Sequence, residues 1–415
     1  NARGDSHFVK FHFKPKQGVH SLVWDESQKI CGKDSDFQRR DLYESIENGD
    51  FPEWTMGVQI VPEKDEHKFD FDLLDPTKII PEELVPVTPM GRLVLDRNPD
   101  NFFAETEQVA FHPGHIVPGI DFTNDPLLQG RLFSYLDTQL KRVGPNFAQL
   151  PINRPTCPMH NNQRDGESQQ LVHKGNAAYF PNSLEGGCPM HTPEAVESFK
   201  SYAEKIDGNK IRVRSPSFAD HFSQATLFWN SMADWEKTHI VDALSFELNN
   251  VQSEPVKQRM LDDLLINVAD EFAHRVADNI GMTIKARPKV KRHNNTSPAL
   301  SMNKPMKNIM GTKIAILCGE GVDAQQVKKL KSMFEAEGGT GVAIARPAKK
   351  AKAAGGQMIA VDMPAANAPS VVFDAVIVPA ARGAVDPLAK LFVMEAYGHA
   401  KTIGAIGSGA SVLEA

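Results

Sequence analysis

The sequence predicts a mixed α+β protein: a portion of an antiparallel β-barrel, an irregular segment, a helical bundle and a doubly wound α/β domain. Three observations support this prediction. Residues 1–139 contain short alternating runs that are typical of antiparallel strands. Residues 217–282 repeat apolar side chains at helical spacing, and residues 311–415 alternate strand-like and helix-like runs, as parallel sheets do. Residues 140–216 and 283–310 lack such periodicity and are predicted to connect these parts.

Alternation of apolar and polar side chains predicts the N-terminal strands. The predicted strands are His7–Lys14, Trp54–Val61, Lys68–Leu73 and Arg92–Asp96. A short helix is predicted at Asp36–Asn48, because Gly49 stands where a left-handed cap would be needed. Strands at this spacing with few helices favour an antiparallel barrel.

The two aperiodic segments differ in composition. Residues 140–216 are rich in Pro, Asn, Gly and Gln, and long coil of this kind is unusual unless it wraps a partner surface. Residues 283–310 carry seven Lys/Arg, no acidic residue and three prolines, which indicates a solvated linker. The helical run between them ends at Gly281, and we interpret its apolar stripe as core packing.

The C-terminal part is predicted to form a parallel sheet with covering helices. The predicted strands are Lys313–Cys318, Ala375–Pro379 and Thr402–Ile406, and the predicted helices are Ala324–Glu337 and Leu388–His399.

Composition excludes some classes of partner. The chain has 415 residues, a formal net charge of −6 and a pI near 6.2, which argues against a dedicated nucleic-acid binder. No apolar stretch reaches the roughly 18 to 20 residues that span a bilayer, so no membrane partner is expected. The compartment stays open between cytoplasm, peroxisome and secretion. Glycosylation sequons at Asn294 and Asn295 favour secretion slightly.

The most informative stretch runs from Arg131 to Gln139 and places Arg131 and Tyr135 one helical turn apart. On a helix, these two side chains share one face. A guanidinium beside a phenol favours the phenolate, whose unperturbed pKa is about 10, and a phenolate is a hard anionic ligand for ferric iron. The alternative is an ordinary Arg/Tyr pair on a helix surface, since such pairs are common.

Further stretches extend this pattern along the chain. They are Gly91–Pro99, Asn101–Glu105, Glu107–Phe111, Pro118–Ile120 and Leu128–Arg131. Together with Arg131–Gln139 they resemble the haem catalases in the same order, from about residue 7 to about residue 280. The resemblance implies a β-barrel core with haem at its outer mouth.

The resemblance also implies roles for particular residues. Tyr135 matches the axial ligand of the haem iron, Arg131 its charge partner, and Arg142 a position that pairs with a haem propionate. Phe111 and Leu127 match apolar positions in contact with haem, although core packing explains them equally well. The implied reaction converts hydrogen peroxide to water and dioxygen through a ferryl intermediate. The implied assembly is a homotetramer in which the wrapping segments thread between subunits.

The stretch Phe111–His115 resembles the large-subunit catalases, in which a histidine at the place of His112 can become joined covalently to the proximal tyrosine. An ordinary loop histidine is an equally good interpretation. The sequence does not decide whether this crosslink forms or whether the haem is haem b or haem d.

The C-terminal part resembles the glutamine-amidotransferase-like, or flavodoxin-like, domain of the large-subunit catalases. Gly407 stands where active relatives of that domain carry a nucleophilic cysteine, and Ser408 is a poor substitute. Cys318 and Glu320 end the first strand, where open α/β sheets bind ligands. We interpret the domain as catalytically silent. Two alternatives to a catalase stay open: the C-terminal domain acts as a chaperone-like or hydrolytic module, or the whole chain is a structural remnant that binds no haem because the distal part of the pocket is absent.

Two residues that the resemblance requires are not found in the sequence. They are the distal histidine and the asparagine that orients peroxide, both of which lie in the family's N-terminal half. Because the sequence opens at Asn1 with Phe8, Phe11 and Phe13 already in a strand-like run, we expect it to be an interior portion of a longer protein.

Two repeated phrases offer a different site. Cys157–His160 and Cys188–His191 both spell Cys-Pro-Met-His, and a pair of such units could form a tetrahedral zinc site or supply a thiolate haem ligand. We favour loop residues, because the segment between the two units is rich in Gln, Asn and Gly and because zinc sites usually pair one tight Cys knuckle with another.

Overall fold

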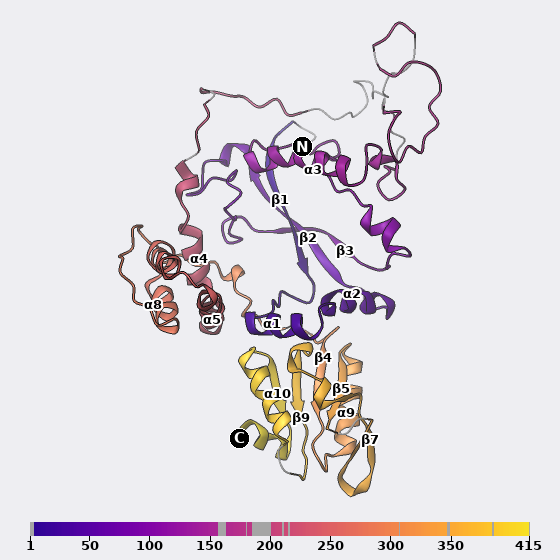
Figure 1. The fold of residues 1–415 in the computed structure, drawn as a ribbon, viewed down its shortest axis with the longest axis vertical. Helices are drawn as coiled ribbons and strands as arrows, with labels where there is room; N and C mark the ends of the chain where they lie inside the picture. The colour runs from indigo at the N-terminus through magenta and orange to yellow at the C-terminus, as the bar shows by residue number, and fades with distance from the viewer. Residues whose placement is uncertain are drawn as a thin grey trace. The chain divides into compact units, whose positions relative to one another are not determined.

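A computed structural model describes residues 4–156, 163–179, 181–184, 201–209, 211–214, 216–306, 308–346, 349–383 and 386–414 (Figure 1). The chain divides into two compact units. The first unit comprises Asn1–Phe11, Val58–Thr88 and Arg97–Asp220, and the second comprises His12–Gly57, Pro89–Asp96 and His221–Ala415.

Three N-terminal strands form one sheet in the order β1-β2-β3. They are β1 (His7–Pro15), β2 (Glu53–Pro62) and β3 (Thr88–Val94), which confirms three of the four predicted strands. The prediction of a barrel is not met, because within the described residues this sheet has three strands and does not close.

The predicted strand at Lys68–Leu73 is wrong. These residues form bends and turns, and the Asp72 carboxylate accepts the backbone N–H of Leu74 at 2.9 Å. Asp75 accepts the N–H of Thr77 in the same way. Aspartate side chains that bond to their own backbone compete with strand pairing, and this local competition overrides the alternating pattern.

Two helices lie between β1 and β2, although the sequence predicted only the second. They are α1 (Trp24–Lys33) and α2 (Phe37–Glu47), and Gly49 follows α2 with φ +83°, as predicted. The buried residues of α1 are Glu26 and Ile30. With a charged residue on its buried face, α1 has no apolar stripe by which periodicity could have revealed it.

Side-chain amides organise the coil that follows α3 (Pro126–Arg142). Asn146, 2% exposed, donates to the backbone carbonyls of Asp165 and Glu167, both at 2.8 Å. Gln149 accepts the N–H groups of Gln170 and Leu171. Amides supply both donors and acceptors, so they replace the backbone partners that a sheet or a helix would have provided.

The predicted helical run is confirmed. It contains α4 (Ser223–Ser231), α5 (Asp234–Asn250), α6 (Glu254–Arg259), α7 (Ile266–Val268) and α8 (Asp270–Asn279), with a π-helical stretch at Met260–Leu265. Trp229 stacks on Phe272 with ring centroids 4.3 Å apart, and Leu261 and Val276 are fully buried. The apolar stripe is core packing.

The segment after these helices is mostly exposed, as its basic composition suggested, and it is also held to them by hydrogen bonds. Asp262 accepts the N–H groups of Lys285 and Ala286, and Asn267 accepts that of Lys289. Further along, Glu236 accepts the hydroxyl of Ser301 at 2.7 Å. These contacts, which the sequence did not predict, join the segment to helices that precede it.

The C-terminal sheet is parallel and has five strands in the order β10-β9-β4-β5-β8. The strands are β4 (Lys313–Leu317), β5 (Thr340–Ala345), β8 (Met363–Pro364), β9 (Ala375–Val378) and β10 (Thr402–Ala405). Helix α9 (Ala324–Ala336) packs on one face with Ile316, and α10 (Pro387–Gly398) packs on the other with Ala315 and Leu317 (Figure 1).

The predicted parallel sheet with helices on both faces is therefore present. The first strand is central, and the order by position in the chain is 3-2-1-4-5, whereas flavodoxin has 2-1-3-4-5. Strands β5 and β8 were not predicted, because β8 has only two residues and β5 begins next to Gly338, Gly339 and Gly341, which weaken a strand pattern.

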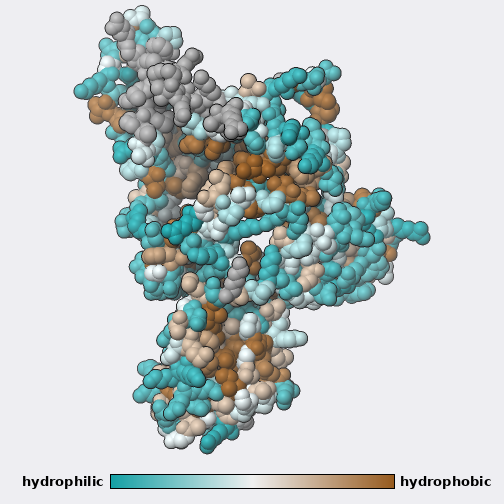
Figure 2. Space-filling model, turned by 180° about the vertical axis from the view of Figure 1, so that it is seen from behind, coloured by the Kyte–Doolittle hydropathy of each residue, from teal (hydrophilic) through white to brown (hydrophobic). Residues whose placement is uncertain are grey.

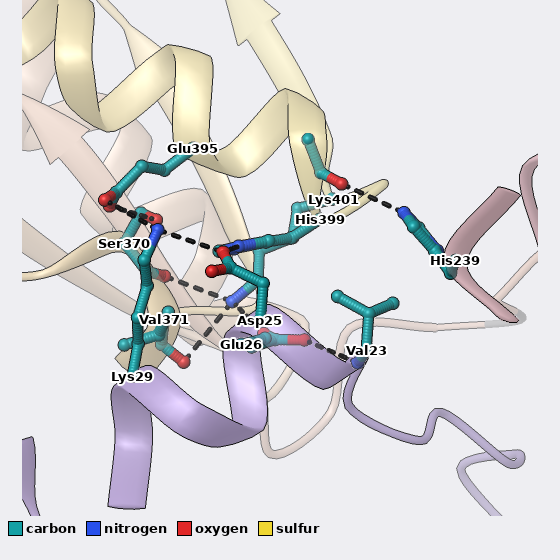
Figure 3. A network of polar contacts seen from close by, with 11 residues as sticks. Val23, Asp25, Glu26, Lys29, His239, Ser370, Val371, Glu395, His399 and Lys401 are labelled. Atoms are coloured by element: carbon teal, nitrogen blue, oxygen red, sulfur yellow. Dashed lines mark hydrogen bonds and ion pairs between the residues drawn. The ribbon is translucent and has the colours of Figure 1, made fainter. Parts of the chain in front are cut away.

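Charged side chains connect α1 to this sheet within the second unit (Figure 3). The ammonium of Lys401 lies 2.6 Å from the Glu26 carboxylate, and these side chains are 10% and 6% exposed. Lys401 also donates to the backbone carbonyls of Ser370, Val371 and Phe373. A buried ion pair with this many hydrogen bonds is satisfied, but the loss of either partner would leave an uncompensated charge.

Two further pairs flank it. The His399 imidazole lies 2.7 Å from the Asp25 carboxylate, and the Lys29 ammonium lies 3.1 Å from Glu395 (Figure 3). Partial burial opposes the charge on Asp25, but hydrogen bonds from His399 and Lys29 outweigh it and hold the pKa of Asp25 below its usual range. Helix α1 thus presents acidic and basic groups that match those on and after α10.

Candidate functional site

Helix α3 carries most of the predicted site residues. The Asp125 side chain caps its first turn by accepting the N–H of Leu128, and Pro126 occupies the first helical position, where its missing donor is harmless. Leu127, Arg131 and Tyr135 recur every four residues, so they lie along one face of the helix.

Arg131 and Tyr135 are brought together as predicted. The Arg131 Nη2 lies 3.5 Å from the Tyr135 hydroxyl, and the guanidinium carbon lies 4.9 Å from the ring centroid. The contact is a cation–π contact at least as much as a hydrogen bond, because 3.5 Å is long for an N–H···O bond. Tyr135 is 37% exposed, so its hydroxyl can reach a ligand.

Arg142 has protein partners in this structure. Its guanidinium donates to the carbonyls of Glu107 and Val109 and to the Gln139 side chain, each at 2.6 Å. The predicted role of Arg142 at a propionate therefore remains a prediction. What the structure shows is that Arg142 ties the segment before Phe111 to α3.

Two residues that sequence reasoning missed complete this contact. Gln139, 6% exposed, donates to the carbonyl of Phe111 at 3.2 Å. Asn153 accepts the N–H of Ala110 and donates to the carbonyl of Gln108, both at 2.8 Å. The sequence gives no clear signal for either residue. Gln139 is a single amide on an amphipathic helix, and Asn153 lies in a segment without periodicity.

His112 is held in a tight turn. Its Nδ1 accepts the backbone N–H of Gly114 at 2.7 Å, and its ring stacks on that of His115 with centroids 4.7 Å apart. A Cβ on Gly114 would lie 2.6 Å from the His112 ring, so any larger residue there would require the ring to move. Burial, followed by the neighbouring His112, lowers the pKa of His115.

Comparison with known proteins identifies the origin of these segments. Residues 1–186 match the family model described as Catalase, residues 215–280 match the model Catalase-related immune-responsive, and residues 310–415 match the C-terminal domain found in long catalases.

The chain belongs to the catalase family.

Individual catalases are similar over nearly the whole chain. Identity is 56% to Catalase HPII of Pseudomonas putida, over 97% of this chain and 58% of that protein. It is 51% to Catalase HPII of Pseudomonas aeruginosa, over 98% of this chain and 59% of that protein. It is 49% to Catalase-2 of Bacillus subtilis, over 100% of this chain and 60% of that protein. The chain therefore spans about three-fifths of the length of these catalases.

Phe111 and Leu127, the apolar residues predicted to contact haem, lie on the surface, and so does Phe133. Phe111 is 75% exposed, Phe133 is 71% exposed and Leu127 is 54% exposed. Figure 2 shows hydrophobic residues gathered at the surface of the part that holds the N-terminal strands and α3. An apolar surface of this kind marks a binding site for a ligand or for another protein surface.

The alternative metal site stays a prediction. Cys157, His160, Cys188 and His191 lie outside the described residues. Among those that are described, no group of three or more His, Cys, Asp or Glu side chains could hold a metal ion. Nor does any helix in the described part of this catalase-family chain have the length and apolar character to cross a membrane.

The turn after β10 carries no poised nucleophile at its predicted position. Gly407 has φ +55°, and the Ser408 hydroxyl donates to the carbonyl of Ala381 and accepts the N–H of the same residue. Burial raises the pKa of the Cys318 thiol to about 12, and Cys318 is 7% exposed. A buried, protonated thiol is inert as a nucleophile.

Proposed function

We propose that this chain forms the proximal side of a haem catalase site, which converts hydrogen peroxide to water and dioxygen. The observation that carries the proposal is the contact of the Arg131 guanidinium with the ring and hydroxyl of Tyr135, on the helix face that also holds the exposed Leu127. The membership of the catalase family supports it.

Tyr135 would hold the haem iron through its ring oxygen, and the haem would supply the redox chemistry. For this the Tyr135 hydroxyl must lose its proton, and the positive charge of Arg131 stabilises the oxygen that results. Because Arg131 lies over the ring and also near the hydroxyl, it orients the phenol as well as balancing its charge.

The surrounding residues would shape the site. Phe111 and Leu127 would cover haem edges and exclude water, which accounts for their exposure in the chain alone. Arg142 would pair with a propionate by exchanging one of its carbonyl partners. A bond between His112 and Tyr135, and the choice between haem b and haem d, belong to the same proposal. So does a homotetramer in which part of the exposed apolar surface becomes an interface.

The experiment that tests this proposal is the replacement of Tyr135 by Phe. We expect the full-length protein, supplied with haem, to show a high-spin ferric spectrum and to evolve oxygen from peroxide, and Tyr135→Phe in that protein to lose stable haem. Tyr397→Phe is the matched control, because Tyr397 is 79% exposed on α10. Undiminished haem content and peroxide decomposition in Tyr135→Phe would refute the proposal.

A further inference from the structure

Residues 107–111 form an irregular segment whose backbone is held almost entirely by side chains. They lie outside any strand, and they follow a π-helical stretch that ends at Glu107. Their side-chain partners come from α3 and from the turn after it. The contacts are Arg142 with the carbonyls of Glu107 and Val109, Asn153 with the carbonyl of Gln108 and the N–H of Ala110, and Gln139 with the carbonyl of Phe111.

Asn153 is the centre of this arrangement. Its oxygen accepts from Ala110 at 2.8 Å, and its nitrogen donates to Gln108 at 2.8 Å and to Phe147 at 3.1 Å. A carboxamide both accepts and donates, whereas a carboxylate only accepts. No other side chain of similar size satisfies these three backbone groups together.

The segment ends at the residues that the proposed site needs. Phe111 and His112 follow directly, and the other end of each contact lies on or beside the helix that carries Tyr135. An irregular segment without ladder hydrogen bonds is otherwise free to open locally. Arg142 and Gln139 of α3 bond three of its backbone groups and Asn153 bonds two more, and these contacts set the positions of Phe111 and His112 relative to Tyr135.

We propose that Asn153 and Gln139 are positioning residues for the haem-facing site: through the backbone of residues 107–111 they hold Phe111 and His112 against the face of α3. This inference rests on the function proposed above. It predicts that replacing the Asn153 amide with a carboxylate of the same shape weakens the site. In Asn153→Asp a carboxylate oxygen would face the carbonyl oxygens of Gln108 and Phe147 and repel them.

Asn146 provides a matched control. It is an amide after α3 that is more deeply buried than Asn153, and it donates to Asp165 and Glu167, in a different stretch of coil. Asn146→Asp therefore introduces the same chemical change, at a more buried position, without touching residues 107–111.

The test compares Asn153→Asp, Asn153→Ala and Gln139→Glu with Asn146→Asp in the haem-supplied protein. Partners that orient groups around a metal site typically contribute 10- to 100-fold, so we expect haem loss to accelerate about tenfold or more in the Asn153 variants. We also expect a displaced Soret maximum. Asn146→Asp should keep the Soret position and the rate of haem loss even where its thermal stability falls. Equal effects in the Asn146 and Asn153 variants would show a general loss of stability and overturn the inference.

A second measurement separates this inference from the proposed function. Hydrogen exchange at the Ala110 amide should accelerate in Asn153→Ala, whereas the amides of Gln170 and Leu171 should keep their protection. Unchanged exchange at Ala110 would overturn the positioning role whether or not haem binds. A protein that binds no haem but shows the expected exchange would instead refute the proposed function and leave the bracing of residues 107–111 intact.

Discussion

The imidazole of His399 lies 2.7 Å from the Asp25 carboxylate, across 374 positions of sequence. This pair, Lys29 with Glu395, and Glu26 with Lys401 join α1 to the C-terminal sheet within one compact unit. If His399 is protonated, three cations face three anions. The C-terminal sheet is thus coupled to a helix from the N-terminal part by charges that depend on one another.

Replacement of Lys401 by Met should destabilise the second unit strongly, because Glu26 would remain buried without a cation. Breaking a buried pair from one side typically costs about 3–5 kcal/mol. Urea unfolding followed by circular dichroism measures the loss. The double variant Glu26→Gln with Lys401→Met should recover part of it, and Lys329→Met, at an exposed site on α9, should have little effect.

The pH dependence of stability should include a contribution from Asp262. Burial opposes its charge, but hydrogen bonds from the Lys285 amide, Gln258 and the Ala286 amide outweigh this and lower the pKa of Asp262. A lowered pKa in the folded state means that the stabilisation is complete above the ordinary value of 3.8 and is lost as the pH falls through the lowered value.

Urea midpoints measured between pH 2.5 and 6 test this expectation. Asp262→Asn should flatten the acid side of the profile, whereas Asp278→Asn, at an exposed site on α8, should leave its shape unchanged. A profile for Asp262→Asn that parallels the unmodified protein would contradict the assignment.

The two described cysteines should differ sharply in reactivity. Burial raises the pKa of Cys318 to about 12, whereas Cys31 is exposed. Iodoacetamide at pH 8 should therefore alkylate Cys31 much faster than Cys318, and peptide mass spectrometry would measure both rates. Unfolding in urea should remove the difference. Rapid alkylation of Cys318 in the folded protein would argue that the end of β4 is open to ligands.

Gly114→Ala should displace the His112 ring, because the added methyl group would lie 2.6 Å from it. Inserting a methyl group where there is no room costs about 1–3 kcal/mol. The control is Gly130→Ala on α3, which has no atom within 4 Å of the new Cβ. It should stabilise the helix by about 0.5–1 kcal/mol. Opposite shifts of the thermal midpoint are the expected result, and a rise for both variants would mean that the turn at His112 can relax.

Local patterns predicted much of this molecule and failed where distant partners decide the structure. Alternation found β1 and β2, and helical spacing placed Arg131 beside Tyr135, because both depend on neighbours in sequence. Helix α1 was not predicted, since its buried face holds a glutamate that is stabilised by Lys401, far along the chain. The roles of Asn153 and Gln139 were not predicted either, because their partners are also distant in sequence.

Because asparagine side chains hold these irregular segments, the segments are sensitive to deamidation as the protein ages. Asn146 and Asn153 each donate to two backbone carbonyls. Hydrolysis of the side-chain amide, a slow spontaneous reaction to which asparagine is prone at high temperature, replaces that donor with a negative oxygen. Deamidation would then replace a hydrogen bond between the side chain and a backbone carbonyl with repulsion between two oxygens. After prolonged heating, the irregular segments should therefore lose their structure before the helices and the parallel sheet do.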